Sequence, residues 1–145
     1  MASWVKFQAF VEHEAEGVHD LGADTLKVML LNSVPSASAD AVKADLPSEI
    51  SAGFGYTAGG SAITVTTSAQ SSGTYTLAAN QLVFTASGGS IGPFQYGVLY
   101  NDTPTSPADP LIAYVDHGSA VTLTTGQTFT LRFNSTNPGT IGTKA

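Results

Sequence analysis

The sequence contains no cysteine, few charged residues and no long apolar run, and each absence excludes a class of protein. Without cysteine, the 145 residues can form neither disulfides nor a thiolate-based zinc site or nucleophile. Charged residues make up 11% of the chain, against about 25% in a typical domain, which excludes a charged disordered segment and a coiled coil. No stretch approaches the roughly 20 apolar residues that a membrane-spanning helix needs.

Positive charge is especially scarce. The cations are scattered singly along the chain: Lys6, Lys27, Lys43, Arg132 and Lys144. With eleven acidic residues they leave a formal net charge of −6. Nucleic acid and anionic membranes are bound by clustered cations, so we expect neither as a partner. Residues 1–6 lack the apolar run of a secretory signal peptide, so we expect synthesis in the cytoplasm.

Uncharged polar and turn-forming residues are abundant instead. The chain has 18 Thr, 15 Ser, 15 Gly and 7 Pro, and 42% of its residues are apolar. This composition is typical of a turn-rich β protein. A chain of this length buries roughly 70% of its unfolded surface, which is enough for one core. We therefore predict a single domain over residues 1–145.

Residues 1–17 carry the one helical pattern. Large apolar residues recur there at three- and four-residue spacing: Trp4, Phe7, Phe10 and Val11. Ser3 can cap the start of the helix and Gly17 can end it. Glu14 falls between Phe7 and Phe10 on this spacing, so either the helix has frayed by then or the carboxylate meets a cation from elsewhere. We expect the sandwich to fold without residues 1–16.

Residues 24–134 alternate between apolar and polar residues, which predicts strands. Eight short runs carry the pattern: 25–31, 63–66, 74–77, 82–84, 94–100, 111–115, 121–123 and 129–133. Turns are predicted at Ala79-Asn80 and around residues 125–127. We predict an all-β fold, a single jelly-roll-like β-sandwich or a small barrel. The connection from Asn32 to Ser61 is unusually long, and residues 135–145 form a C-terminal tail.

Two motifs resemble catalytic or metal-binding signatures. Residues 88–92 match the G-x-S-x-G elbow around Ser90, and Asp109 or Asp116 followed by His117 supplies the usual order of a triad. The motif leads directly into a strand, however, so we interpret it as a glycine-rich turn.

His13-Glu14 opens like the zinc motif H-E-x-x-H but lacks its second histidine. His19, Asp20 and Asp24 lie nearby in the sequence, and solvated surface is the preferred interpretation. Asp116-His117 is interpreted as a cap or a turn at a strand end. We therefore predict no catalytic, cofactor-binding or metal-binding residue, and no cofactor.

Aromatic residues leave an open question about contacts. The N-terminal helix can pack on its own sandwich, which we favour, or dock on a neighbouring subunit. Residues 55–60 can form either a contact loop or a turn whose tyrosine closes the sandwich. The candidate residues for an interface with another subunit or a capsid are Trp4, Phe7, Phe10, Val11, Glu14, Tyr56 and Tyr100.

Five stretches taken together resemble a family of small virion structural proteins of tailed bacteriophages. They are Gly17–Gly22, Asp24–Val28, Gly55–Gly60, Thr85–Phe94 and Val98–Asp102. The resemblance covers nearly the whole chain, and its motifs are turns and strand starts. Members of this type look like capsid decoration or cement proteins, β-sandwiches that sit on the outer shell and clamp neighbouring capsomers.

The resemblance implies a non-enzymatic protein located on the capsid exterior of the virion. Its implied partners are the major capsid protein and further copies of itself, with a homotrimer as the expected state. Some relatives are called tail or fibre proteins. The alternative is therefore a tail or fibre module in which Tyr56, Tyr100 and the loop 102–110 bind host-surface glycan.

Overall fold

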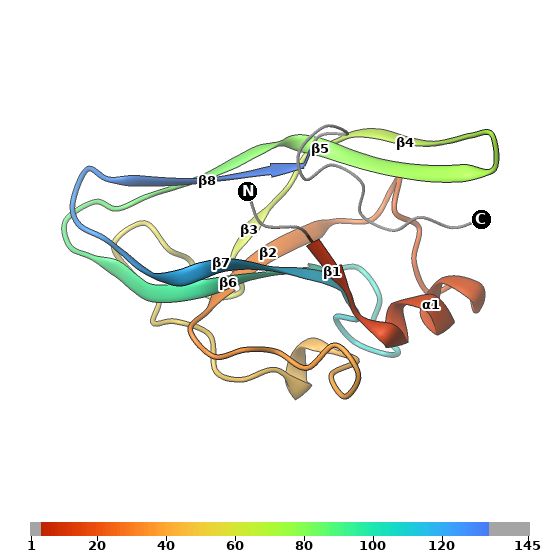
Figure 1. The fold of residues 1–145 in the computed structure, drawn as a ribbon, viewed down its shortest axis with the longest axis horizontal. Coiled ribbons are helices and arrows are strands. Elements are labelled where there is room, and N and C mark those ends of the chain that lie inside the picture. Colours follow the sequence, from red (N-terminus) through yellow and green to blue (C-terminus); the bar gives the residue numbers. More distant parts are fainter. Residues whose placement is uncertain (1–3, 134–145) are drawn as a thin grey trace.

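The computed structural model describes residues 4–133, in which eight strands and one α-helix form two packed layers (Figure 1). Ser3, proposed as a helix cap, and the tail 135–145 lie outside the described residues. The elements in chain order are β1 Trp4–Lys6, α1 Gln8–Ala15, β2 Leu26–Leu31, the 3₁₀ turn η1 Lys43–Asp45, β3 Ser61–Ala62, β4 Val65–Ser71, β5 Thr74–Thr85, β6 Ile91–Asn101, β7 Leu111–Leu123 and β8 Thr128–Phe133.

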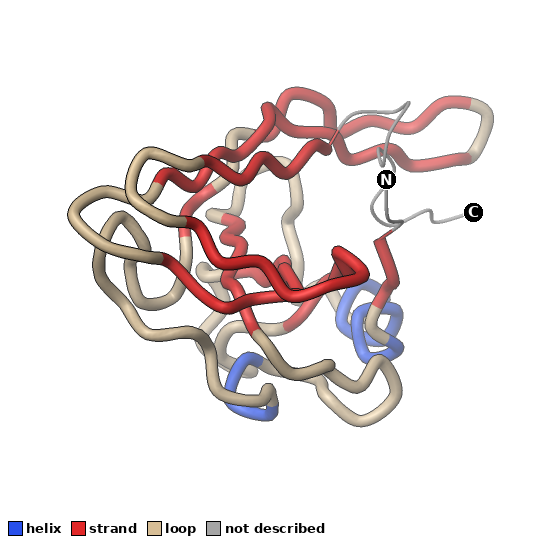
Figure 2. Tube along the Cα trace, turned by 60° about the vertical axis from the view of Figure 1, so that its left-hand side comes forward, coloured by secondary structure: helices blue, strands red, loops and turns tan. Residues whose placement is uncertain are grey.

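The two layers are antiparallel sheets of unequal width. The wider sheet has the order β1-β7-β6-β2-β3, and the narrower one has the order β4-β5-β8. Figure 2 shows the sheets facing each other, with the β4–β5 hairpin extending beyond the wider sheet. The predicted all-β sandwich with a short N-terminal helix is confirmed.

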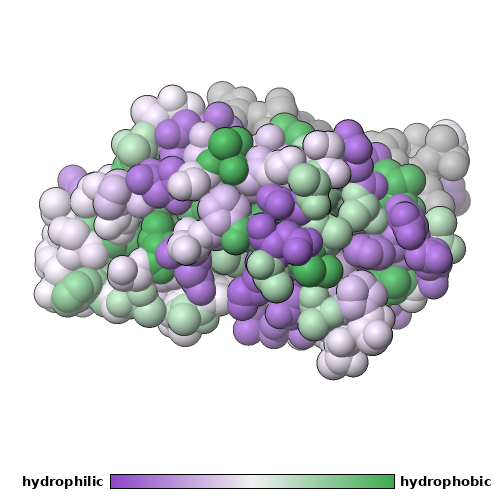
Figure 3. All heavy atoms as spheres, turned by 90° about the horizontal axis from the view of Figure 1, so that it is seen from below, coloured by the Kyte–Doolittle hydropathy of each residue, from purple (hydrophilic) through white to green (hydrophobic). Residues whose placement is uncertain are grey.

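The wider sheet is buried on both faces, because side chains of β2 alternate between two apolar clusters. Val28 and Leu30 face the main core between the sheets, whereas Met29 and Leu31 belong to a second cluster on the opposite face. The long connection between β2 and β3 covers this second cluster, with Leu46 packed against it. The side of the molecule seen in Figure 3 mixes hydrophilic and hydrophobic residues without a broad apolar patch.

The predicted helix over residues 1–17 is wrong in its first part. Residues 4–6 form a strand at the sheet edge, where Trp4 pairs with Val115, and α1 begins only at Gln8. Phe7 and Phe10 enter different clusters, on opposite faces of the wider sheet. The three-residue spacing of aromatic residues, which is typical of a helix, therefore arises here where the chain changes from a strand to a helix. Since Phe7 is fully buried, removing residues 1–16 would open the core, contrary to expectation.

Of the two predicted turns, the one at Ala79-Asn80 is wrong and the one around residues 125–127 is confirmed. Ala79-Asn80 lies inside β5 as an irregularity in the pairing with β8, because the strand shifts from one neighbour to the other at this point. The turn around residues 125–127 connects two sheets: β7 pairs with β6 and β1, whereas β8 pairs with β5. A local sequence signal for a turn is the same whether the next strand folds back or crosses the core.

Candidate functional site

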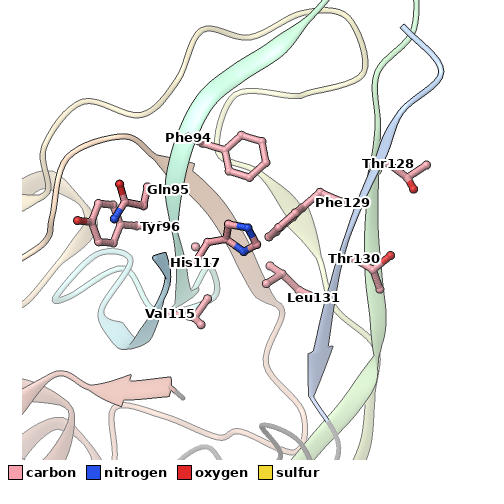
Figure 4. Close-up of a pocket in the computed structure, with 10 residues that line it drawn as sticks. Phe94, Gln95, Tyr96, Val115, His117, Thr128, Phe129, Thr130 and Leu131 are labelled. Atoms are coloured by element: carbon pink, nitrogen blue, oxygen red, sulfur yellow. The ribbon is translucent and has the colours of Figure 1, made fainter. Parts of the chain in front are cut away.

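A pocket of about 510 Å³ opens at one end of the sandwich, between β6, β7 and β8. Figure 4 shows the side chains that reach into it, which are Phe94, Val115, His117, Phe129 and Leu131. Thr128 and Thr130 contribute to the wall from β8, but their side chains point away from the opening (Figure 4). The interior of the pocket is therefore mainly apolar, with His117 at its mouth.

The pocket exists because β7 bulges away from β6. Phe94 pairs with Val121 and Tyr96 pairs with Asp116, so the single residue Gln95 faces the whole segment 117–120. A bulge of this kind bends a strand and redirects a side chain. Here it takes residue 117 out of the ladder and leaves the adjoining end of the core uncovered.

Asp116 stabilises the bulge. Its Oδ1 atom accepts hydrogen bonds from Nε2 of Gln95 at 2.9 Å and from the backbone N–H of Gly118 at 2.7 Å. These bonds, the first more strongly, lower the pKa of Asp116 below its ordinary value, so the carboxylate stays ionised at neutral pH. The predicted cap or turn at a strand end is wrong, because Asp116 and His117 lie inside β7 at the irregularity in its pairing with β6.

Aromatic edges and faces form the wall of the pocket. The rings of Phe94 and Phe129 meet edge to face, with centroids 5.0 Å apart, and His117 meets Phe129 in the same way at 5.3 Å. Edge-to-face packing is a preferred geometry of aromatic pairs and contributes about 0.5–1.5 kcal/mol beyond the area that the rings bury. The pocket can accept an apolar group from a ligand or a neighbouring protein. Sequence reasoning missed it because alternation does not reveal a bulge.

A second hollow lies between α1 and the β4–β5 hairpin and includes Glu14, His19, Asp20 and Tyr75. The rings of His13 and His19 are 6.1 Å apart, which brings the histidines of the incomplete zinc motif together. Among residues 4–133, however, no three His, Asp or Glu side chains converge as metal ligands.

The tautomer of His19 also argues against a metal site. Oδ1 of Asn101 accepts the backbone N–H of Thr103, so the Asn101 amide nitrogen faces His19 Nδ1 at 3.1 Å. Nδ1 must then accept this hydrogen bond, and Nε2 must carry the ring proton. Burial, with a smaller effect of His13, lowers the pKa of His19 to about 4. The ring is therefore neutral at pH 7 but presents no free lone pair.

Ser90 does not lie in a nucleophile elbow. It is exposed in the turn between β5 and β6 and leads into a strand, where an elbow would lead into a helix. Gly89 allows this turn, because a Cβ atom there would lie 2.4 Å from the Phe54 ring. No hydrogen bond within the described chain joins Ser90 to His117.

Residues 55–60 close the sandwich. The Tyr56 hydroxyl accepts the backbone N–H of Leu30 at 3.0 Å and donates to Oε2 of Glu49 at 2.8 Å. The Tyr100 hydroxyl donates to the carbonyl of Gly59 at 2.5 Å. Burial raises the pKa of both tyrosines. Of the two interpretations of this segment, the structure therefore supports the closing turn.

The candidate interface residues divide into two groups. Four are at most 4% exposed and belong to the core of the chain itself: Phe7, Phe10, Tyr56 and Tyr100. These four must be removed from the predicted contact surface, and the two tyrosines cannot stack on a glycan in this conformation. Val11 is 54% exposed, while Trp4 and Glu14 are half-buried. The ring of Trp4 stacks on the ring of Phe133, with centroids 5.2 Å apart.

No helix among residues 4–133 is long and apolar enough to cross a membrane. Comparison of the chain with protein-family models, with curated proteins and with solved structures gave no match.

Proposed function

We propose that this chain is a non-enzymatic structural protein of a tailed-bacteriophage virion. In this proposal it decorates the outer capsid surface and stabilises the head by bridging capsomers. The resemblance of five motifs is the basis of the proposal. The structure supports it through the use of those motifs: Tyr56 and Gly89 build a closing turn and a tight strand connection, which are features of a rigid binding platform.

The distribution of charge is the observation that carries the proposal furthest. No Asp, Glu, Lys or Arg occurs from Ile50 to Asn101, a span that contains β3, β4, β5 and β6. In the narrower sheet, Arg132 of β8 is the one charged residue. A chain of net charge −6 thus has a sheet that can approach another acidic protein with little repulsion.

The apolar pocket adjoins this sheet of low charge, since β8 contributes to both. A side chain of the major capsid protein that enters the pocket would meet the Phe129 ring and the Leu131 side chain. Single buried anchors of this kind contribute about 2 kcal/mol or more to an interface. Because the decoration protein binds the assembled shell, each bound copy stabilises that shell by mass action.

Rebinding to virions that lack the protein tests this proposal. We expect added protein to saturate the particles at a fixed ratio to the capsid protein and to raise the temperature at which heads release DNA. Val115→Phe fills the pocket from its floor and should weaken binding at least about tenfold. Val34→Phe adds the same volume on an exposed loop and should bind normally. Failure of the unaltered protein to bind heads would refute the proposal.

A further inference from the structure

Strand β4 is an open sheet edge. It is the outermost strand of the narrower sheet, and no other segment of the described chain pairs with its outer side. Every residue of β4 after Val65 is exposed. The unpaired backbone groups of such an edge are a template for another strand.

The other outermost strands of the two sheets, in the described part of the chain, are short or charged. β1 and β3 have three and two residues, and the longer β8 carries Arg132. Short length and charge are the usual means of preventing edge-to-edge association. β4 has seven residues, no charge and no proline, and its one irregularity lies at its start, between Val65 and Thr67.

We propose that β4 pairs antiparallel with β4 of a second copy, around a two-fold axis, to form a continuous six-stranded sheet. A two-fold contact uses the same surface on both partners, so the edge must be compatible with itself. β4 meets this condition because no charged residue lies between Ile50 and Asn101. Two chains of net charge −6 can therefore pair at this strand without placing like charges opposite each other along the strands themselves. The nearby acidic residues Glu14 and Asp20 lie beside the hairpin, in the hollow that Ser68 and Tyr75 line.

The hairpin turn defines which backbone groups face outward. Ser72 and Gly73 have φ angles of 52° and 81°, as in a two-residue hairpin turn. The residues that flank such a turn exchange hydrogen bonds within the hairpin, so Ser71 directs its N–H and C=O toward β5. Backbone direction alternates along a strand, and the groups of Gln70 and Ser68 consequently point to the open edge.

These directions give the register of the pair. Ser68 of one copy would exchange backbone hydrogen bonds with Gln70 of the other, and Ala69 would face itself on the axis. The residues on the axis form a pair without hydrogen bonds, which is the pair type with the closest side chains. The small side chain of Ala69 fits this position.

The inference goes beyond the proposed function, since it assigns a self-association surface that holds whether or not the protein binds a capsid. It also differs from the trimer that the resemblance implies. A six-stranded sheet without charges in its central strands would present a broader neutral surface to a shell.

The mass of the protein in solution tests the pair. Light scattering at micromolar to millimolar concentration should give twice 14.8 kDa for the unaltered chain. Ala69→Lys places two like charges on the axis and should weaken dimerisation at least about tenfold. Thr76→Lys is the matched control, because Thr76 pairs with Ala69 on the neighbouring strand and lies away from the axis. This variant should remain a dimer.

Three further measurements make the result decisive. Mixing Ala69→Lys with Ala69→Asp should restore a dimer, which shows that the variants fold. Hydrogen exchange at the amides of Ser68 and Gln70 should be slower in the dimer than in the Ala69→Lys monomer. Removing residues 134–145 should leave the dimer intact. A monomeric or trimeric unaltered chain, a dimer insensitive to Ala69→Lys, or loss of the dimer on truncation would overturn the inference.

Discussion

The side-chain amide of Asn101 donates a hydrogen bond to Nδ1 of His19, and the two residues lie 82 positions apart in the chain. The same nitrogen donates to Oδ2 of Asp24 at 2.7 Å. Asn101 is fully buried and His19 is 9% exposed. This contact connects the end of β6 to the segment between α1 and β2, where burial, with a smaller effect of His13, keeps the imidazole neutral.

The neutral state of His19 predicts a dependence of stability on pH. Its pKa is about 4 in the folded chain, below the ordinary value of 6.5. Between these values the unfolded chain binds a proton that the folded chain does not, so stability falls as the pH is lowered from 6.5 to 4. We expect a loss of about 2 kcal/mol, measured by urea unfolding at several pH values. His19→Gln should remove most of this loss, and an unchanged slope would contradict the assignment.

Asn101→Ala should destabilise the fold. It leaves the backbone N–H of Thr103 and Nδ1 of His19 without their partner, while Oδ2 of Asp24 keeps only its hydrogen bond from the N–H of Asp20. Groups left unpaired in this way cost about 1–3 kcal/mol. Asn80→Ala is the control, since Asn80 is exposed and its substitution should cost less than about 0.5 kcal/mol. Equal effects in urea unfolding would show that the Asn101 contacts contribute little.

Tyr56→Phe tests the closing turn. The hydroxyl of Tyr56 serves both the N–H of Leu30 and the carboxylate of Glu49, so its removal should cost about 1–2 kcal/mol of unfolding free energy. Tyr114→Phe removes a hydroxyl for which the described residues offer no hydrogen-bond partner, and it should be nearly neutral. The account of residues 55–60 fails if the two substitutions have the same effect.

Gly60→Ala should prevent normal folding. Gly60 has a φ angle of +83°, and a Cβ atom there would lie 1.8 Å from the carbonyl oxygen of Val28. Because that oxygen belongs to the backbone of β2, it cannot move away from residue 60 without breaking the pairing of β2 with β3. Gly17→Ala has a similar φ of +75° but no atom within 4 Å, so it should cost only about 1 kcal/mol of strain. The thermal unfolding temperatures of the two variants separate the effect of the steric clash at residue 60 from that of backbone strain alone at residue 17.

Alternation in the sequence predicted most strands correctly, and the errors have physical causes. The runs at 74–77 and 82–84 are one strand, β5, and those at 111–115 and 121–123 are another, β7. In each case a bulge or a change of partner interrupts the alternation without ending the strand. The total of eight strands is nevertheless right, because β1 and β3 were not predicted.

The interruption of the alternation by a bulge also explains why the sequence did not predict the pocket. The sequence places Phe94, Tyr96 and Val98 on one face of a strand, but Phe94 lies in the main core and Val98 in the second cluster. The shift in pairing between Phe94 and Tyr96 reverses the faces. The pairing shifts here by three residues, and a shift by an odd number of residues moves every following side chain to the other face. The position of such a shift depends on long-range pairing.

The most direct test of the proposed function is the number of copies of this protein in purified virions. Quantitative mass spectrometry can measure it against the major capsid protein. If the protein decorates the capsid, its copy number per virion should be constant and close to that of the major capsid protein. A handful of copies per particle would contradict the proposed function and favour a tail or fibre component. Complete absence would show that the protein is not part of the virion.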